Sequence, residues 1–175
     1  TGALVEAVPN TGYQFDRWSD GESNPKRRET NVEAWTTITA IFVPLECIVN
    51  FYTEWGELLD TQSVIYGELF EAVSPPIGKE ISGYQLRSSG VKLNSFAVFN
   101  SMDIQVRLSP VQLTVTYIGG QEPSRVFDYG DVLTFPEAFS EGERLKQWED
   151  SDGNIYDESH IVTEAITVIA VFIAW

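Results

Sequence analysis

His160 is the residue of this sequence best suited to acid–base chemistry, because an imidazole changes its charge near neutral pH. It is the sole histidine among 175 residues, so the chain offers neither a second imidazole nor a histidine-rich metal cluster. The sequence contains no Gly-x-Ser-x-Gly elbow, His-Glu-x-x-His helix, P-loop or dinucleotide-binding fingerprint. The 26 Asp and Glu residues gather at turns and outward strand positions, where solubility explains them better than a catalytic carboxylate pair. We therefore expect no catalytic residue, no cofactor and no enzyme activity.

A calcium site is the most specific metal hypothesis, since hard cations bind several oxygen ligands presented by one tight turn. The candidate ligands are Asp150, Asp152, Asn154 and Asp157. Their spacing fails the EF-hand rule, because a glycine follows Asp152 directly and Ile161 stands where the final glutamate of the loop belongs. An Asp-Gly hairpin turn accounts for the same residues, so we expect a turn and no bound metal.

Three tryptophans are candidates for binding a host protein or a glycan, because an exposed indole can stack on a sugar face or fill a partner's pocket. They are Trp55, Trp35 and Trp175, and packing within a strand is the alternative for each. Trp55 is the most suggestive because Gly56 follows it in a turn. Trp18 and Trp148 precede Asp-Gly turns at matching positions and are expected to be core anchors.

The charge of the chain excludes two classes of partner. A formal net charge of −15 repels phosphate backbones and anionic lipids, so we expect neither nucleic-acid binding nor direct membrane insertion. The only clustered bases, Lys26 to Arg28, are expected to form a solvated edge. The single cysteine, Cys47, lies in an alternating apolar stretch and is expected to be a small buried residue. We also expect the protein to be monomeric.

The elements that must position these residues are strands. Apolar and polar residues alternate with period two in segments such as 113–117 and 167–172, and turn-forming pairs such as Gly119-Gly120 and Asp152-Gly153 lie between the strands. No segment gives three helical turns, and the stretch 136–143 predicts at most one short helix or a loop. We therefore expect a mainly β fold with little helix.

The chain also repeats itself. Gly12, Phe15 and Trp18 recur as Gly142, Leu145 and Trp148, and the closing strand 37–42 recurs as 167–172, each 130 positions later. The middle third has a Tyr-Gly pair, Tyr66-Gly67, that recurs in the last third as Tyr129-Gly130. Its Gly83-Tyr84 step is expected to correspond to Gly12-Tyr13. A period of about 65 residues predicts three tandem modules, 1–43, 46–109 and 111–175, the first without its opening strands. Pro44 and Pro110 fall at the junctions and predict short, stiff linkers.

These patterns resemble the Listeria-Bacteroides repeat, the internalin B-repeat family. The last module carries the resemblance through Val115, Tyr117, Gly119, Gly120, Tyr129, Gly130, Pro136, Leu145, Trp148, Asp152, Gly153, Tyr156, Val162, Thr163, Ile166, Thr167, Ala170 and Phe172. The first module resembles the divergent form of the repeat through Ala7, Pro9, Gly12, Tyr13, Phe15, Trp18, Asp20, Gly21, Pro25, Thr37, Ile38, Thr39, Ala40 and Phe42.

The resemblance implies β-grasp-like modules without catalytic residues, found in tandem in bacterial exported and surface-attached proteins. We expect a stalk, spacer or adhesion segment at the cell surface, with the signal and anchor outside residues 1–175. A binding module that recognises a host protein or glycan through exposed aromatic residues is the alternative.

Overall fold

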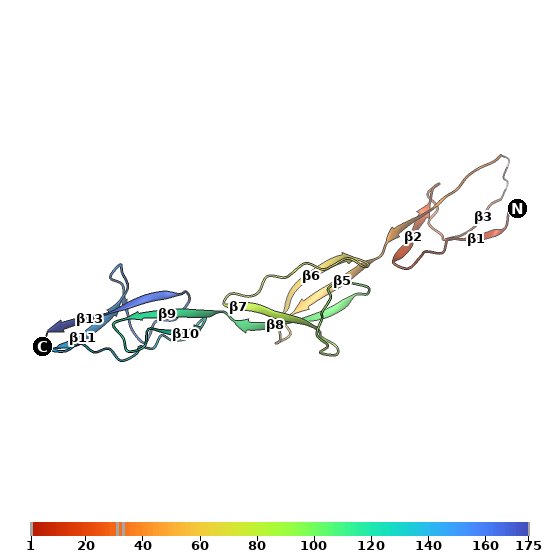
Figure 1. Cartoon of the computed structure of the whole chain (residues 1–175). Coiled ribbons are helices and arrows are strands. Elements are labelled where there is room, and N and C mark those ends of the chain that lie inside the picture. The colour runs from red at the N-terminus through yellow and green to blue at the C-terminus, as the bar shows by residue number, and fades with distance from the viewer. Residues whose placement is uncertain (1, 31, 33, 175) are drawn as a thin grey trace. The chain divides into compact units, whose positions relative to one another are not determined.

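The computed structural model describes residues 2–30, 32 and 34–174 (Figure 1). These residues form 13 strands in several small sheets, and no helix occurs among them, which confirms the expected mainly β fold. The chain divides into two compact units, residues 1–73 with 83–107 and residues 74–82 with 108–175. The finer division into three modules stays a prediction.

The first 45 residues form two small antiparallel sheets. One pairs β1 with β3, and the other pairs β2 with β4. The bounds of these strands are Leu4–Glu6 (β1), Tyr13–Trp18 (β2), Lys26–Arg28 (β3) and Ala40–Pro44 (β4).

Two larger sheets follow, and their strand orders correspond except that the second sheet has an additional edge strand, β12. The sheet β6-β5-β8-β7 consists of Glu46–Tyr52 (β5), Leu58–Ile65 (β6), Lys79–Leu86 (β7) and Met102–Pro110 (β8). The sheet β10-β9-β13-β11-β12 consists of Gln112–Ile118 (β9), Ser124–Asp128 (β10), Glu143–Glu149 (β11), Ile155–Tyr156 (β12) and Ile166–Ala174 (β13).

In each of these two sheets the first and last long strands are parallel neighbours. Phe51 of β5 pairs with Ile104 of β8, and Tyr117 of β9 pairs with Val168 of β13. Parallel strands require a long crossover connection, which is usually helical. Here the crossover contains irregular backbone, including the stretch 136–142, where the sequence allowed a short helix.

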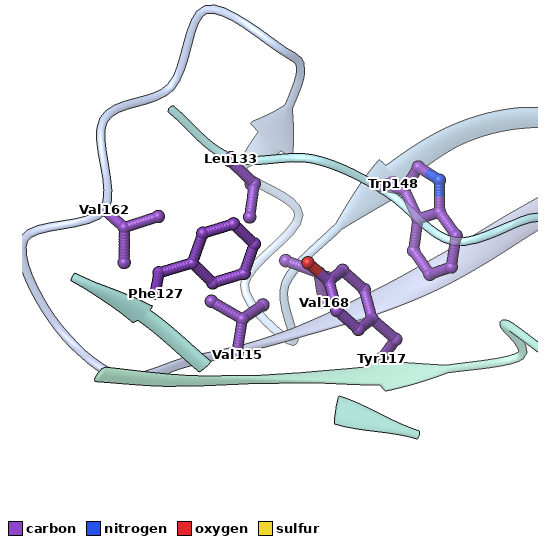
Figure 2. Packing of buried hydrophobic residues seen from close by; sticks show 7 residues of the cluster. All are labelled: Val115, Tyr117, Phe127, Leu133, Trp148, Val162 and Val168. Carbon is purple, nitrogen blue, oxygen red and sulfur yellow. The ribbon is translucent and has the colours of Figure 1, made fainter. Parts of the chain in front are cut away.

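Alternation along β9 determines what the last sheet buries. Val115 and Tyr117 face inward, and the irregular crossover covers them with Leu133. Figure 2 shows this core, whose buried side chains are Val115, Tyr117, Phe127, Leu133, Trp148, Val162 and Val168. Burying an aliphatic side chain contributes about 1.5–3 kcal/mol, so this cluster supplies much of the stabilising energy of the sheet.

Trp18 and Trp148 are core residues, as the sequence predicts. Their exposed fractions are 7% and 4%. The indole of Trp148 stacks on Phe135 with the ring centroids 5.5 Å apart, and its edge meets Tyr117. Trp18 packs beside Phe15, whose centroid lies 5.6 Å away. Cys47 is also buried, as expected.

The middle sheet corrects one sequence correspondence. Gly78, directly before β7, has a φ of 73° and matches Gly12 before β2 and Gly142 before β11. Counting six residues onward from each glycine gives Tyr84, Trp18 and Trp148, so Tyr84 takes the tryptophan position. Its ring packs on Phe51, Phe70 and Phe96, with centroids 6.2, 5.5 and 5.4 Å away. The expected match of Gly83 to Gly12 was therefore wrong, because it placed Tyr84 one residue after the glycine.

Candidate functional site

Trp55 lies in the three-residue turn of the β5–β6 hairpin, and its side chain is 71% exposed. The turn is closed by the amide of Thr53, which donates to the carbonyl of Glu57 at 2.8 Å. The amide of Gly56 donates to the carbonyl of Thr53, and Gly56 adopts a φ of 88°. Thr53 is 1% exposed and its hydroxyl accepts from the amide of Glu57, so a buried residue fixes the base of the turn. The indole is thus held outward on an ordered turn.

The same turn occurs at two other places in the chain. At both, an aspartate precedes the glycine: Asp20 before Gly21, with a φ of 94°, and Asp152 before Gly153, with a φ of 85°. A three-residue hairpin loop needs the glycine for its left-handed conformation and makes no demand for an aromatic residue before it. Trp55 therefore stands where the other two turns have an aspartate, and turn geometry does not explain its indole.

Arg87 lies beside this turn. Its Cζ is 3.9 Å from the centroid of the Tyr52 ring, and its Nη2 is 3.3 Å from the position that a Cβ on Gly56 would occupy. A cation over an aromatic face is attracted by the ring quadrupole, which fixes the guanidinium next to the turn. Trp55 and Arg87 therefore flank one patch of surface in the first unit.

An open groove continues from Arg87 along the sheet. It is lined by Ile48, Asn50, Leu86, Arg87, Ser88, Asn100, Ser101, Met102 and Asp103. Its polar groups bond to one another: the amide of Asn50 donates to Asp103 at 2.9 Å, and the hydroxyl of Ser101 accepts from the amide of Ile48 at 2.9 Å. These mixed polar and apolar walls suit a protein or sugar surface better than they suit acid–base chemistry.

The other two tryptophan candidates lie apart from this groove or outside the described residues. Trp35 is fully exposed in a shallow hollow that it shares with Val32, Ala34 and Thr36. Trp175 lies outside the described residues. Trp35 and Trp55 line no common hollow among those that the structure describes.

The calcium candidates Asp150, Asp152 and Asn154 lie in one turn, and the carboxylate oxygens of Asp150 bond within the chain. The Oδ1 of Asp150 accepts from the amides of Asp152 and Asn154, both at 2.9 Å, and its Oδ2 accepts from the side chains of Asn154 and Tyr156. These bonds, with the Asn154 side chain contributing most, lower the pKa of Asp150 below its usual value. Across residues 2–30, 32 and 34–174, no three His, Cys, Asp or Glu side chains gather so as to hold a metal ion.

Asp157 and His160 also make contacts within this segment. The carboxylate of Asp157 accepts from the amide of Ser159 at 2.8 Å, and the bonds from Ser159 lower the pKa of Asp157. The ring of His160 packs edge-on against Tyr156, with the centroids 4.7 Å apart. The amide of His160 also donates to the carbonyl of Asp157 at 3.1 Å, so this histidine packs as part of the turn.

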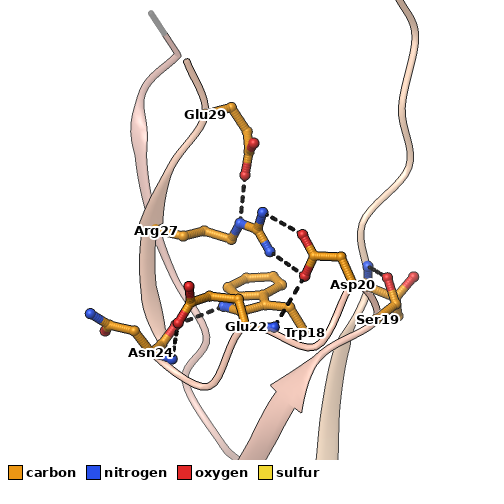
Figure 3. A network of polar contacts seen from close by, with 8 residues as sticks. Trp18, Ser19, Asp20, Glu22, Asn24, Arg27 and Glu29 are labelled. Atoms are coloured by element: carbon orange, nitrogen blue, oxygen red, sulfur yellow. Dashed lines mark hydrogen bonds and ion pairs between the residues drawn. The ribbon is translucent and has the colours of Figure 1, made fainter. Parts of the chain in front are cut away.

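Arg27 is a structural cation whose pairing the sequence did not predict. Figure 3 shows its guanidinium between two acids: Nη1 and Nη2 lie 3.0 and 2.8 Å from the two oxygens of Asp20, and Nε donates to Glu29. Its Cζ also lies 5.0 Å from the centroid of the Trp18 ring. The side chain is only 12% exposed, so the expected solvated edge is wrong for this residue. The paired arginine lowers the pKa of Asp20 to about 2.

Two glycines lie against two tyrosines of the Tyr-Gly pairs. A Cβ on Gly12 would lie 2.6 Å from Cδ1 of Tyr66, within the first unit, and one on Gly78 would overlap the ring of Tyr129, within the second. The same hydrogen bonds accompany both contacts. The carbonyl of Gly12 accepts from Leu45, whose carbonyl accepts from the amide of Tyr66.

In the second unit, Val111 takes the place of Leu45. Its amide donates to the carbonyl of Gly78 at 3.0 Å, and its carbonyl accepts from the amide of Tyr129 at 2.8 Å. Each glycine thus bonds to the residue that follows β4 or β8, and that residue bonds to the tyrosine whose ring lies against the glycine. One glycine–tyrosine contact is therefore built twice in the chain.

Comparison with known families identifies the first part of the chain. The family model of the divergent InlB B-repeat domain matches residues 1–45, which confirms the resemblance for this part of the chain. No curated protein matches the chain. The family is a repeat domain that is generally non-catalytic and typically occurs in surface proteins, and the match fits a repeat segment of such a protein. No helix in the described part of the chain is long and apolar enough to cross a membrane.

Proposed function

We propose that this chain is a non-catalytic spacer of a bacterial exported or cell-surface protein, which holds other domains at a distance from their attachment point. The observation that carries the proposal is the glycine–tyrosine contact, because it joins successive repeats twice with the same hydrogen bonds. A spacer needs joints that resist bending, and a ring packed on a glycine with backbone bonds on either side restricts the linker in that way.

The chemistry of the surface supports the same role. The hydrogen bonds of Asp150 and Asp157 shape turns, and His160 packs on Tyr156. The net charge of −15 keeps such a segment soluble and away from phosphate and anionic lipid. These features require neither a substrate nor a cofactor.

Backbone ¹⁵N relaxation tests the stiffness of the first joint. Residues 13–44 and 46–73 should report the same rotational correlation time in the native chain, because the Gly12–Tyr66 contact makes them tumble together. In Tyr66→Ala the two correlation times should separate and shorten. Different times in the native chain would contradict a stiff joint.

A second function, recognition of a host protein or glycan, is favoured by Trp55. Trp55 is an exposed indole at a turn position that holds aspartate twice elsewhere, and Arg87, which lies next to Gly56 of the same turn, lines an open groove. Trp55→Asp is the sharpest variant, since it restores the residue of the other two turns and keeps the hairpin. A glycan array and a surface pull-down should lose signal in Trp55→Asp. If the native chain binds nothing in either assay, this second function is contradicted.

A further inference from the structure

The turn before β11 repeats the two turns that receive tyrosine rings. In all three, the residue after the glycine donates its amide three residues back: Tyr13 to Asn10 at 3.0 Å, Lys79 to Pro76 at 3.0 Å and Glu143 to Ser140 at 3.2 Å. The glycines have nearly the same φ, 85° at Gly12, 73° at Gly78 and 77° at Gly142. A positive φ at the third position of a four-residue turn is the type II geometry, so the three turns present the same backbone surface.

The three glycines differ in what covers them. Gly12 is buried under Tyr66 and Gly78 is half-buried under Tyr129, whereas Gly142 is exposed. No atom of the described residues lies within 4 Å of the position that a Cβ on Gly142 would occupy. The third surface is therefore built like the other two and is open.

The strands around this surface are also arranged like those of the first repeat. Tyr13, after Gly12, pairs with Pro44 of β4, and Glu143, after Gly142, pairs with Ala174 of β13. Both pairs have a register shift two residues further along, between Phe15 and Arg17 and between Leu145 and Gln147. The backbone that surrounds Gly12 when it binds Tyr66 is thus reproduced around Gly142.

We propose that the Gly142 surface is a docking site for the tyrosine ring of a Tyr-Gly turn on a further repeat unit of the same kind. The occupant must carry this turn because both occupied copies receive a ring from one: Tyr66 precedes Gly67, and Tyr129 precedes Gly130. These glycines have φ values of 86° and 94°, so the turn that presents the ring is also the same in both copies. Tyr66 and Tyr129 are already packed on Gly12 and Gly78, so the ring comes from an additional unit.

The inference rests on the same contact as the proposed spacer function, and its test is independent of particle stiffness. A chain of residues 1–174 followed by a second copy of 111–175 places Val111 of the added copy directly after Ala174, as it follows Pro110 in the native chain. Proton NMR then reports the contact through the Hα shifts of Gly142, because a ring face shields a proton that lies against it. Gly12 and Gly78 in Tyr66→Leu and Tyr129→Leu chains calibrate the effect.

The Hα signals of Gly142 should move upfield in the extended chain, in the same sense as the calibrated signals of Gly12 and Gly78. They should return to the native position when the tyrosine of the added copy is changed to leucine. Gly153→Ala in the extended chain should leave the shift in place, since Gly153 has a φ of 85° and nothing within 4 Å of its Cβ position. An extended chain with a folded added copy and unmoved Gly142 signals would overturn the inference, even if scattering showed a stiff rod.

Discussion

The α-carbon of Gly12 lies against the ring of Tyr66, so that a Cβ at this position would be 2.6 Å from Cδ1 and 3.1 Å from Cε1 of the ring. Real Cβ atoms do not approach other carbons so closely, so alanine would force the ring away. The contact also depends on the backbone, because Gly12 has a φ of 85°, a region that costs other residues about 1 kcal/mol or more.

Gly12→Ala should therefore destabilise the first unit more than a matched glycine change. Gly21→Ala is the control, since Gly21 has a φ of 94° and nothing within 4 Å of its Cβ position. Both variants bear the conformational cost, and Gly12→Ala bears an added overpacking cost of about 1–3 kcal/mol. Denaturant unfolding gives the two free energies of unfolding. Equal losses would show that the ring moves away at no cost.

Trp148→Ala should destabilise the chain strongly, whereas Trp55→Ala should leave its stability nearly unchanged. Trp148 is 4% exposed and stacks on Phe135, so its removal should cost about 3–5 kcal/mol in the free energy of unfolding. Trp55 is 71% exposed on its turn, and its removal should change stability by less than about 0.5 kcal/mol. Thermal unfolding of both variants measures the difference. A large loss in Trp55→Ala would place its indole in the core.

Acid should weaken the first unit through Asp20. Its pKa is lowered from 3.8 to about 2 by Arg27, so the folded state favours the ionised carboxylate. The stabilisation is fully present above about pH 4 and is lost as the pH falls toward 2. Asp20→Asn should remove this part of the pH dependence in unfolding measured from pH 5 to 2. Asp152→Asn, at the same turn position in the second unit, should keep it, and an unchanged slope in Asp20→Asn would contradict the ion pair.

Calcium should neither bind nor stabilise the second unit. Each oxygen of the Asp150 carboxylate already accepts two hydrogen bonds, so a cation would have to compete with these donors for its lone pairs. Isothermal titration with calcium should give no binding heat, and the melting temperature should not move. A saturable heat that disappears in Asp150→Ala would show that these residues are ligands after all.

The strands and the tryptophan anchors could be predicted because their signals are local. The period-two alternation of 113–117 needs no knowledge of the rest of the chain, and Trp18 and Trp148 recur with the same spacing. The ion pairs of Arg27 could not be predicted, because three adjacent basic residues are typical of an exposed edge. Its partner Asp20 lies seven residues earlier and meets it only through the fold of the turn.

The contacts of Gly12 and Gly78 could not be read from sequence for a related reason. Their tyrosines lie more than 50 positions away, and a glycine before a strand usually indicates a turn and no more. In the middle repeat, the sequence pointed to Gly83 because a tyrosine follows it directly, as Tyr13 follows Gly12, whereas Lys79 follows Gly78. Only the backbone conformation and the tyrosine ring distinguish the two glycines.

Small-angle X-ray scattering of the native chain tests the spacer function most directly. The account predicts an elongated, stiff particle, whose maximum dimension does not change with salt and whose flexibility increases in Gly12→Val and Gly78→Val chains. A compact globular particle of the same mass, or a native chain as flexible as the two variants, would contradict it.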